Sequence, residues 1–137
     1  MNSGLPEIFQ GLPQSVRNMN ELRALLRRFG NSTFFFKNDF KRALKLIEPD
    51  ELLYYINSNF CTIRDRAGNK IAGGSAVVAV LFFSNKRFFA MMTATLEVFQ
   101  IPLNEIHSVA STKGRFLRSD QISFCTLDKN ITFTLVG

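Results

Sequence analysis

The clearest hydrophobic pattern in the chain lies near its middle. An apolar run over residues 76–83 is followed by the polar sequence SNKR and by a second apolar run over 88–92. Short runs rich in Val and Phe, separated by a few turn-forming residues, are typical of the two strands of an antiparallel hairpin. We predict that Asn85 and Lys86 form the two-residue turn, because Asn tolerates the positive φ that such turns require.

The sequence from residue 51 onward predicts further strands on both sides of this hairpin. Aromatic and β-branched residues or strict alternation mark them, and turn-forming residues separate them. Gly73 and Gly74 indicate a break before the hairpin. The seven predicted strands cover 52–63, 76–83, 88–92, 96–101, 106–111, 116–127 and 131–136. Seven short strands at regular spacing favour a β-sandwich or a small barrel.

The N-terminal third carries a helical pattern. Residues 1–14 contain two Gly, two Pro and no apolar period, which predicts a flexible arm. We expect Ser15 to cap a first helix and a second helix to run from Asn38 to Ile47. The apolar residues of the first helix return at helical spacing: Met19, Leu22, Leu25, Leu26 and Phe29. Basic amphipathic helices lie on a membrane surface or fold back onto their own protein, and we expect these two to fold back.

The positive charge of the chain is concentrated in these helices. The net charge is +6, and residues 1–47 hold eight Lys or Arg against three acids (8 − 3 = +5). Residues 48–137 hold nine against eight (9 − 8 = +1). Such an asymmetry suggests an acidic partner, which can be a lipid surface, a nucleic acid or an acidic protein.

Composition favours packing over chemistry. The 137 residues suffice for one domain with a sizeable core, and they include 15 Phe and no Trp. Phe offers large apolar area without a polar group. We find no secretory signal, which would be a basic segment followed by an apolar one. No stretch approaches the roughly 18 apolar residues of a membrane span. We therefore expect a cytoplasmic protein.

Residue patterns for catalysis or metal binding are missing from the sequence. His107 is the single histidine, and it has no ligand spacing to either cysteine. The glycines match neither a phosphate-binding loop nor a dinucleotide-binding fingerprint. Cys61 and Cys125 are expected to be free buried thiols, and a disulfide requires that their strands be neighbours. We expect no enzymatic activity, no metal and no cofactor.

Three segments of the chain resemble the bacterial pleckstrin-homology-like (PH-like) domains, in particular their YokE-like group. They are EPDE at 48–51, LFFSNKRFFAM at 81–91 with Ser84 in place of Thr, and IPLNEIHSV at 101–109. Together they place the resemblance on about two-thirds of the chain. It implies a seven-stranded, bent antiparallel sheet in a partly open barrel, usually plugged by a C-terminal helix. Since the sequence stops after the seventh predicted strand, either the chain is cut short or the N-terminal helices plug the barrel.

We therefore expect a mainly β protein with N-terminal helices (α+β) in three parts. They are a flexible arm (1–14), a helical segment packed on the barrel (15–47) and a PH-like barrel domain (48–137). The resemblance implies a non-catalytic binding or assembly module of the bacterial cytoplasm. Its partner is expected to be a protein or a second copy of the chain.

Basic loop residues suggest an alternative function. In eukaryotic relatives, basic residues between the first two strands bind phosphoinositide headgroups, and this chain has Arg64, Arg66 and Lys70 there. The resemblance thus offers peripheral binding of an anionic lipid, or of another phosphate-bearing ligand, as the alternative to protein binding. The protein would then associate with a membrane surface.

A second basic set can form a lip near the hairpin: Lys86, Lys113, Arg115 and Arg118. Phosphate contacts from such a lip would give salt-dependent binding. A nucleic acid is the less favoured ligand, because stacking of bases requires exposed aromatic residues and Phe116 is the single candidate.

We expect structural roles for the two remaining hairpin residues. Asn85 belongs to the turn, and Arg87 lays its aliphatic stem on the sheet while its guanidinium pairs with a carboxylate such as Glu105.

Overall fold

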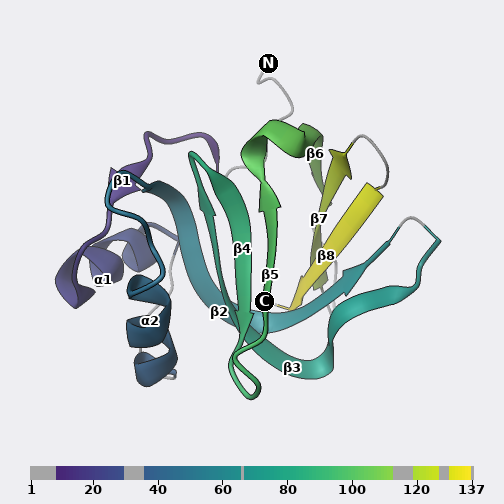
Figure 1. Cartoon of the computed structure of the whole chain (residues 1–137), viewed down its shortest axis with the longest axis horizontal. Coiled ribbons are helices and arrows are strands. Elements are labelled where there is room, and N and C mark those ends of the chain that lie inside the picture. The colour runs from purple at the N-terminus through teal and green to yellow at the C-terminus, as the bar shows by residue number, and fades with distance from the viewer. Residues whose placement is uncertain (1–8, 30–35, 66, 113–118, 127–129, 137) are drawn as a thin grey trace.

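Figure 1 shows the computed structural model of the chain, which describes residues 9–29, 36–65, 67–112, 119–126 and 130–136. Its helices are α1 (Met19–Arg28), α2 (Lys37–Leu44) and a short 3-10 helix, η2 (Leu103–Glu105). Its strands are β1 (Gln14–Ser15), β2 (Leu52–Arg64), β3 (Lys70–Ser84), β4 (Arg87–Met92), β5 (Val98–Pro102), β6 (Ile106–Thr112), β7 (Ser119–Thr126) and β8 (Asn130–Val136).

The strands form one antiparallel sheet in the order β5-β4-β3-β2-β8-β7-β6, and β1 pairs with the start of β2. The prediction of a mainly β chain with an antiparallel sheet and two helices is thereby confirmed. β5 and β6 stand at opposite ends of this order, and each pairs with one neighbour among the described strands. The sheet therefore does not close into a barrel.

A bulge in β3 contributes to the bend of the sheet. Phe60 pairs with Val78, but Thr62 pairs with Gly73, so four residues of β3 stand opposite one residue of β2. Gly73 has φ +77°, and a Cβ there would lie 2.1 Å from the carbonyl oxygen of Cys61, so the position requires glycine. The predicted break at the glycine pair is wrong, because β3 continues through it.

Both faces of the central strands are buried, and consecutive residues of β3 alternate between them. Phe82 stacks on Phe89 on one face, with 4.5 Å between the ring centroids. Phe83 contacts Phe88 on the other face, at 4.7 Å. The Phe83 face also receives apolar residues of β5 and β6, the two ends of the strand order, so this cluster lies inside the bend. The Phe82 face lies under the helices.

The two helices cover the outer face of the sheet. Leu22, Leu25 and Leu26 of α1 and Phe40 of α2 are fully buried in the same cluster as Phe82. The helices therefore pack on β2, β3 and β4, at the left of Figure 1. Phe29, at the end of α1, also reaches the Phe83 cluster, where its ring centroid lies 4.9 Å from that of Tyr55. No helix in the described part of the chain is long and apolar enough to cross a membrane.

The helix boundaries differ from the prediction. Asn18, not Ser15, caps α1: its side chain accepts a hydrogen bond from the Glu21 N–H at 2.9 Å. Ser15 instead pairs with Leu52 as part of β1. The second helix starts one residue earlier than predicted and ends at Leu44, three residues earlier.

The predicted arm is partly attached to the sheet. Residues 1–8 lie outside the described part of the chain. Phe9 packs against Tyr54 and Phe83, with centroid distances of 5.6 and 5.2 Å, and Gln14 pairs with Leu53.

Candidate functional site

The hairpin between β3 and β4 turns through Asn85 and Lys86, as predicted. The Ser84 hydroxyl fixes this turn, because its oxygen accepts from the N–H groups of Lys86 and Arg87, both at 3.0 Å. The expected reason for Asn85 is wrong, since its φ is not positive. Its N–H donates to the Leu52 carbonyl and its side-chain oxygen accepts from the Leu52 N–H, both at 2.9 Å, so it extends the pairing with β2.

A buried ion pair joins this hairpin to the segment before β2. The guanidinium of Arg87 donates from Nε to Oε2 and from Nη2 to Oε1 of Glu51, both at 3.0 Å. The Glu51 side chain is fully buried and that of Arg87 is 14% exposed. The carboxylate also accepts from the Ser84 hydroxyl at 2.5 Å and from the Glu48 N–H at 3.1 Å. A buried charge is tolerated when its hydrogen-bonding capacity is filled in this way.

These contacts lower the pKa of Glu51. Burial raises the pKa of this carboxyl, but hydrogen bonds from Arg87, Ser84 and the backbone, together with the charge of Arg87, lower it by more. Glu51 is therefore ionised at neutral pH.

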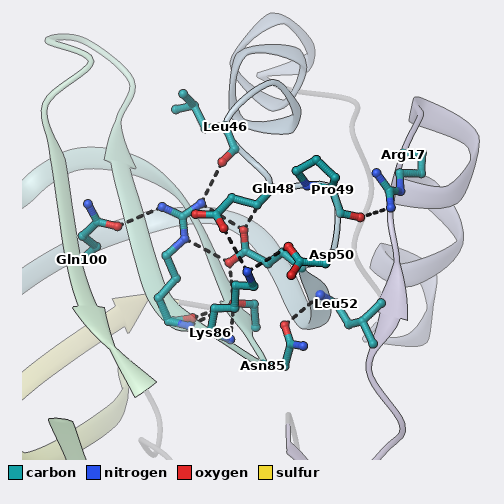
Figure 2. Close-up of polar contacts among 12 residues, drawn as sticks. Arg17, Leu46, Glu48, Pro49, Asp50, Leu52, Asn85, Lys86 and Gln100 are labelled. Carbon is teal, nitrogen blue, oxygen red and sulfur yellow. Dashed lines mark hydrogen bonds and ion pairs between the residues drawn. The ribbon is translucent and has the colours of Figure 1, made fainter. Parts of the chain in front are cut away.

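Arg87 is held by the sheet as well as by Glu51 (Figure 2). Its Nη1 donates to the Gln100 side chain at 2.9 Å and its Nη2 to the Leu46 carbonyl at 2.7 Å. The guanidinium carbon lies 5.3 and 5.0 Å from the ring centroids of Phe82 and Phe89. The prediction of a stem on the sheet and a carboxylate partner is right, but the partner is Glu51 and not Glu105.

Lys86 engages the other two acids of the same segment. Its Nζ lies 3.0 Å from Glu48 Oε1 and 2.8 Å from Asp50 Oδ1 (Figure 2). A hydrogen bond from Lys86 lowers the pKa of Asp50, and the reciprocal hydrogen bonds with Asp50 and Glu48 raise the pKa of Lys86. The Arg17 side chain binds the Pro49 carbonyl in the same figure, which ties the start of α1 to this segment.

We call residues 48–51 and 84–87, with these contacts, the clasp. It brings together two of the three segments on which the family resemblance depends. Each acid of the clasp is matched by a cation of the clasp, so Lys86 is already committed to two carboxylates. Sequence reasoning missed Glu51 as the partner, although EPDE is the densest run of acids in the sequence and directly precedes a predicted strand. The clasp holds the fold together, and its geometry does not point to a ligand.

The other predicted ligand residues do not form one site with Lys86. Arg64 and Lys70 pair with each other across β2 and β3, and Arg64 Nη1 donates to the Gly68 carbonyl at 3.0 Å. Lys86 follows the opposite end of β3. The remaining candidates lie outside the described residues: Arg66, Lys113, Arg115 and Arg118.

Among the cysteines, the structure describes the surroundings of Cys61, and they are as predicted. Cys61 is buried and free, and burial raises its pKa to about 12. A disulfide with Cys125 required that the strands of the two cysteines be neighbours. β8 lies between these strands, so the condition is not met. His107 is exposed. Within the described ranges no three His, Cys, Asp or Glu residues gather as metal ligands would.

The edge of β5 is the candidate interaction site. Its register is fixed by hydrogen bonds from Met92 N–H to the Glu97 carbonyl and from Leu103 N–H to the Lys86 carbonyl. In an antiparallel ladder every second residue faces the partner strand. The backbone groups of Val98, Gln100 and Pro102 therefore face away from β4, where no other described strand pairs.

Exposed apolar side chains accompany this edge. Val98 is 40% exposed, and Leu96 and Leu103, which flank the strand, are 49% and 40% exposed. Pro102 has no N–H, so it limits how far a pairing strand can extend. The edge thus offers two N–H groups and three carbonyl groups, with exposed apolar side chains beside them.

No protein-family model matches the chain, and no curated protein matches it in sequence.

Proposed function

We propose that this chain is a non-catalytic interaction module with a PH-like fold that self-associates through the edge of β5. The strand order supports the PH-like part of the proposal. β2 to β5 follow one another as a four-stranded meander, β6 to β8 as a three-stranded one, and the late part of β2 pairs with β8 to join them. That is a bent seven-stranded antiparallel sheet of the kind that the family resemblance implies.

The observation that carries the functional proposal is the edge of β5, along which no further strand pairs in the described part of the chain. An open edge favours the addition of a strand from another chain, because each outward N–H and C=O then gains a partner. Two copies related by a two-fold axis can pair their β5 strands antiparallel, with Val98 of each opposite Gln100 of the other. Each copy then contributes the same backbone N–H and C=O groups to the interface. The exposed side chains of Leu96, Val98 and Leu103 would lose water contact at this interface.

A binding role also fits the polar residues of the clasp. Glu51 and Arg87 satisfy each other in the interior, and Lys86 is engaged with Glu48 and Asp50. A general acid or base needs a proton that it can exchange with a substrate, whereas the buried Glu51 carboxylate already accepts from Arg87, from the Ser84 hydroxyl and from the Glu48 N–H. The described polar residues therefore support assembly over chemistry.

Sedimentation equilibrium of the wild-type chain and two variants tests the proposal. Val98→Pro removes an outward N–H and leaves the ladder between β4 and β5 intact, because Val98 does not donate to β4. Val98→Ala is the matched control, since it keeps that N–H. We expect a concentration-dependent dimer for wild type and Val98→Ala, and a monomer for Val98→Pro with unchanged circular dichroism. A wild-type chain that stays monomeric at millimolar concentration contradicts the proposal.

A further inference from the structure

The helical layer on the outer face of the sheet is strongly basic. Its described residues, 9–29 and 36–47, contain eight basic side chains against two acids, Glu21 and Asp39, which leaves six positive charges. The basic residues are Arg17, Arg23, Arg27, Arg28, Lys37, Lys41, Arg42 and Lys45. The layer is thus as positively charged as the whole chain, whose net charge is also +6.

The cations of the two helices lie outside the apolar faces that these helices bury against the sheet. α1 and α2 bury their apolar faces in one cluster on the sheet, so the two helices form one layer on the same face of the sheet (Figure 1). On α2, Lys37, Lys41 and Lys45 follow one another at intervals of four residues and form one stripe. On α1, Arg23 and Arg27 have the same spacing. We call these five residues the basic face.

Most of the basic face is not neutralised by the protein itself. Within the described residues, the ion pair formed by this layer is that of Arg42 with Asp39, at 2.8 Å. Arg27, Lys37, Lys41 and Lys45 have no acidic side chain within ion-pair distance in the same part of the chain. Like charges held close together on one surface attract a polyanion more strongly than the same charges dispersed over the molecule.

Apolar side chains are exposed at both ends of the lysine stripe. Phe36, directly before Lys37, is 39% exposed, and Leu46, directly after Lys45, is 44% exposed. A bilayer interface accommodates this combination, because the apolar groups enter the headgroup region while the ammonium groups meet lipid phosphates. A groove for single-stranded nucleic acid would call for exposed aromatic residues beside several of the cations. In the described part of the helical layer, Phe36 is the exposed aromatic residue, at one end of the stripe.

We infer that the basic face docks on an anionic phospholipid bilayer. The helices do not insert, because Leu22, Leu25, Leu26 and Phe40 are already fully buried against the sheet. Binding is instead peripheral and electrostatic, with shallow contacts from Phe36 and Leu46, and it weakens as salt screens the charges. This surface differs from the basic loops that the sequence suggested, and it does not involve the β5 edge.

Co-sedimentation with vesicles of equal parts phosphatidylcholine and phosphatidylglycerol tests the inference at low salt. We expect the wild-type chain to bind these vesicles, to be released by added salt and to leave pure phosphatidylcholine vesicles unbound. A triple variant, Lys37→Gln, Lys41→Gln and Lys45→Gln, should reduce the partition coefficient about 100-fold. Each cation near an anionic surface strengthens binding about five-fold, and the variant loses three of them. Gln keeps the helix propensity of Lys, so α2 should remain folded.

A second triple variant removes the same charge elsewhere: Arg64→Gln, Lys70→Gln and Lys86→Gln. It should bind the vesicles within a few-fold of wild type, because its residues lie on β2, on β3 and in the β3–β4 turn, outside the basic face. Equal losses in the two triple variants would show an effect of net charge alone and overturn the inference, as would absence of wild-type binding at low salt. Tighter binding to duplex DNA than to vesicles, abolished by the α2 variant, would assign the basic face to nucleic acid.

The β5 edge is tested separately by the same assay. Val98→Pro should still bind anionic vesicles as a monomer. The dimerisation of Val98→Pro therefore tests the proposed function alone, provided that this variant still binds vesicles. The vesicle binding of the α2 variant tests this inference alone, provided that this variant still dimerises.

Discussion

Replacing Arg87 by Met should expose the role of the clasp in stability. Met keeps an unbranched apolar stem over Phe82 and Phe89 but removes the guanidinium that binds Glu51. The Glu51 carboxylate would then be buried with the Ser84 hydroxyl and the Glu48 N–H as its remaining donors.

The expected loss follows from the burial of the pair. Removing one partner of a buried ion pair costs about 3–5 kcal/mol, because the other charge is left uncompensated away from water. At about 4 °C of melting temperature per kcal/mol for a domain of this size, the variant should melt roughly 12–20 °C below wild type. Lys86→Met is the matched control on the same hairpin. It breaks exposed pairs with Glu48 and Asp50, and such pairs contribute little.

The loss should also depend on pH. In wild type the folded-state pKa of Glu51 lies below its ordinary value of 4.5, so its stabilising effect is present above that pH and is lost as the pH falls through the lowered pKa. Without Arg87, burial dominates and raises the pKa of Glu51, so the variant gains stability as acid protonates this carboxyl. The difference in unfolding free energy should therefore be largest at neutral pH. It should shrink as the pH falls from the raised pKa of the variant to the lowered pKa of wild type.

Urea unfolding of wild type, Arg87→Met and Lys86→Met across this pH range measures both effects. A loss in Arg87→Met no greater than in Lys86→Met would refute the assignment of the clasp as a structural ion pair. A loss that is the same at neutral and acidic pH would refute the role of the Glu51 charge.

Three further predictions concern the core. Gly73→Ala should destabilise the fold strongly, because its Cβ would lie 2.1 Å from the carbonyl oxygen of Cys61. Gly68→Ala is the control: its φ is +89° but the space around it is open, so it should cost about 1–2 kcal/mol in chemical denaturation. Leu25→Ala should cost about 2–5 kcal/mol, since its side chain is fully buried under the sheet, and a smaller loss would mean that α1 is not part of the core. In a Cys125→Ser background Cys61 should react with a thiol reagent at pH 8 only after unfolding, because burial raises its pKa to about 12; rapid labelling of the folded protein would contradict this.

Patterns local to the sequence predicted the elements well. The central hairpin is correct because the two apolar runs and the SNKR break lie within a few residues of one another. The apolar arc of α1 is correct for the same reason, since Leu22, Leu25 and Leu26 are one helical turn apart and all are buried. Cap positions were less predictable, because Ser15 and Asn18 are both good N-cap residues and the pairing of Ser15 with Leu52 decides between them.

Contacts between distant segments were not predictable. Glu105 was the carboxylate named as a partner for Arg87, whereas the strand arrangement brings Glu51 to it. A pair of glycines is typical both of a turn and of a β-bulge, so the sequence could not show that Gly73 and Gly74 lie in a bulge. One available signal was not used: residues 79–83 are apolar without alternation, and a strand of this kind in an antiparallel sheet needs cover on both faces. The helices supply that cover.

Amide hydrogen exchange measured as a function of protein concentration tests the central functional claim most directly. The N–H groups of Val98 and Gln100 face away from β4, whereas that of Phe99 faces β4. If β5 pairs with a second copy, the exchange of Val98 and Gln100 should slow as the concentration rises, while that of Phe99 stays slow throughout. Fast exchange at Val98 and Gln100 at every concentration would contradict self-association through this edge.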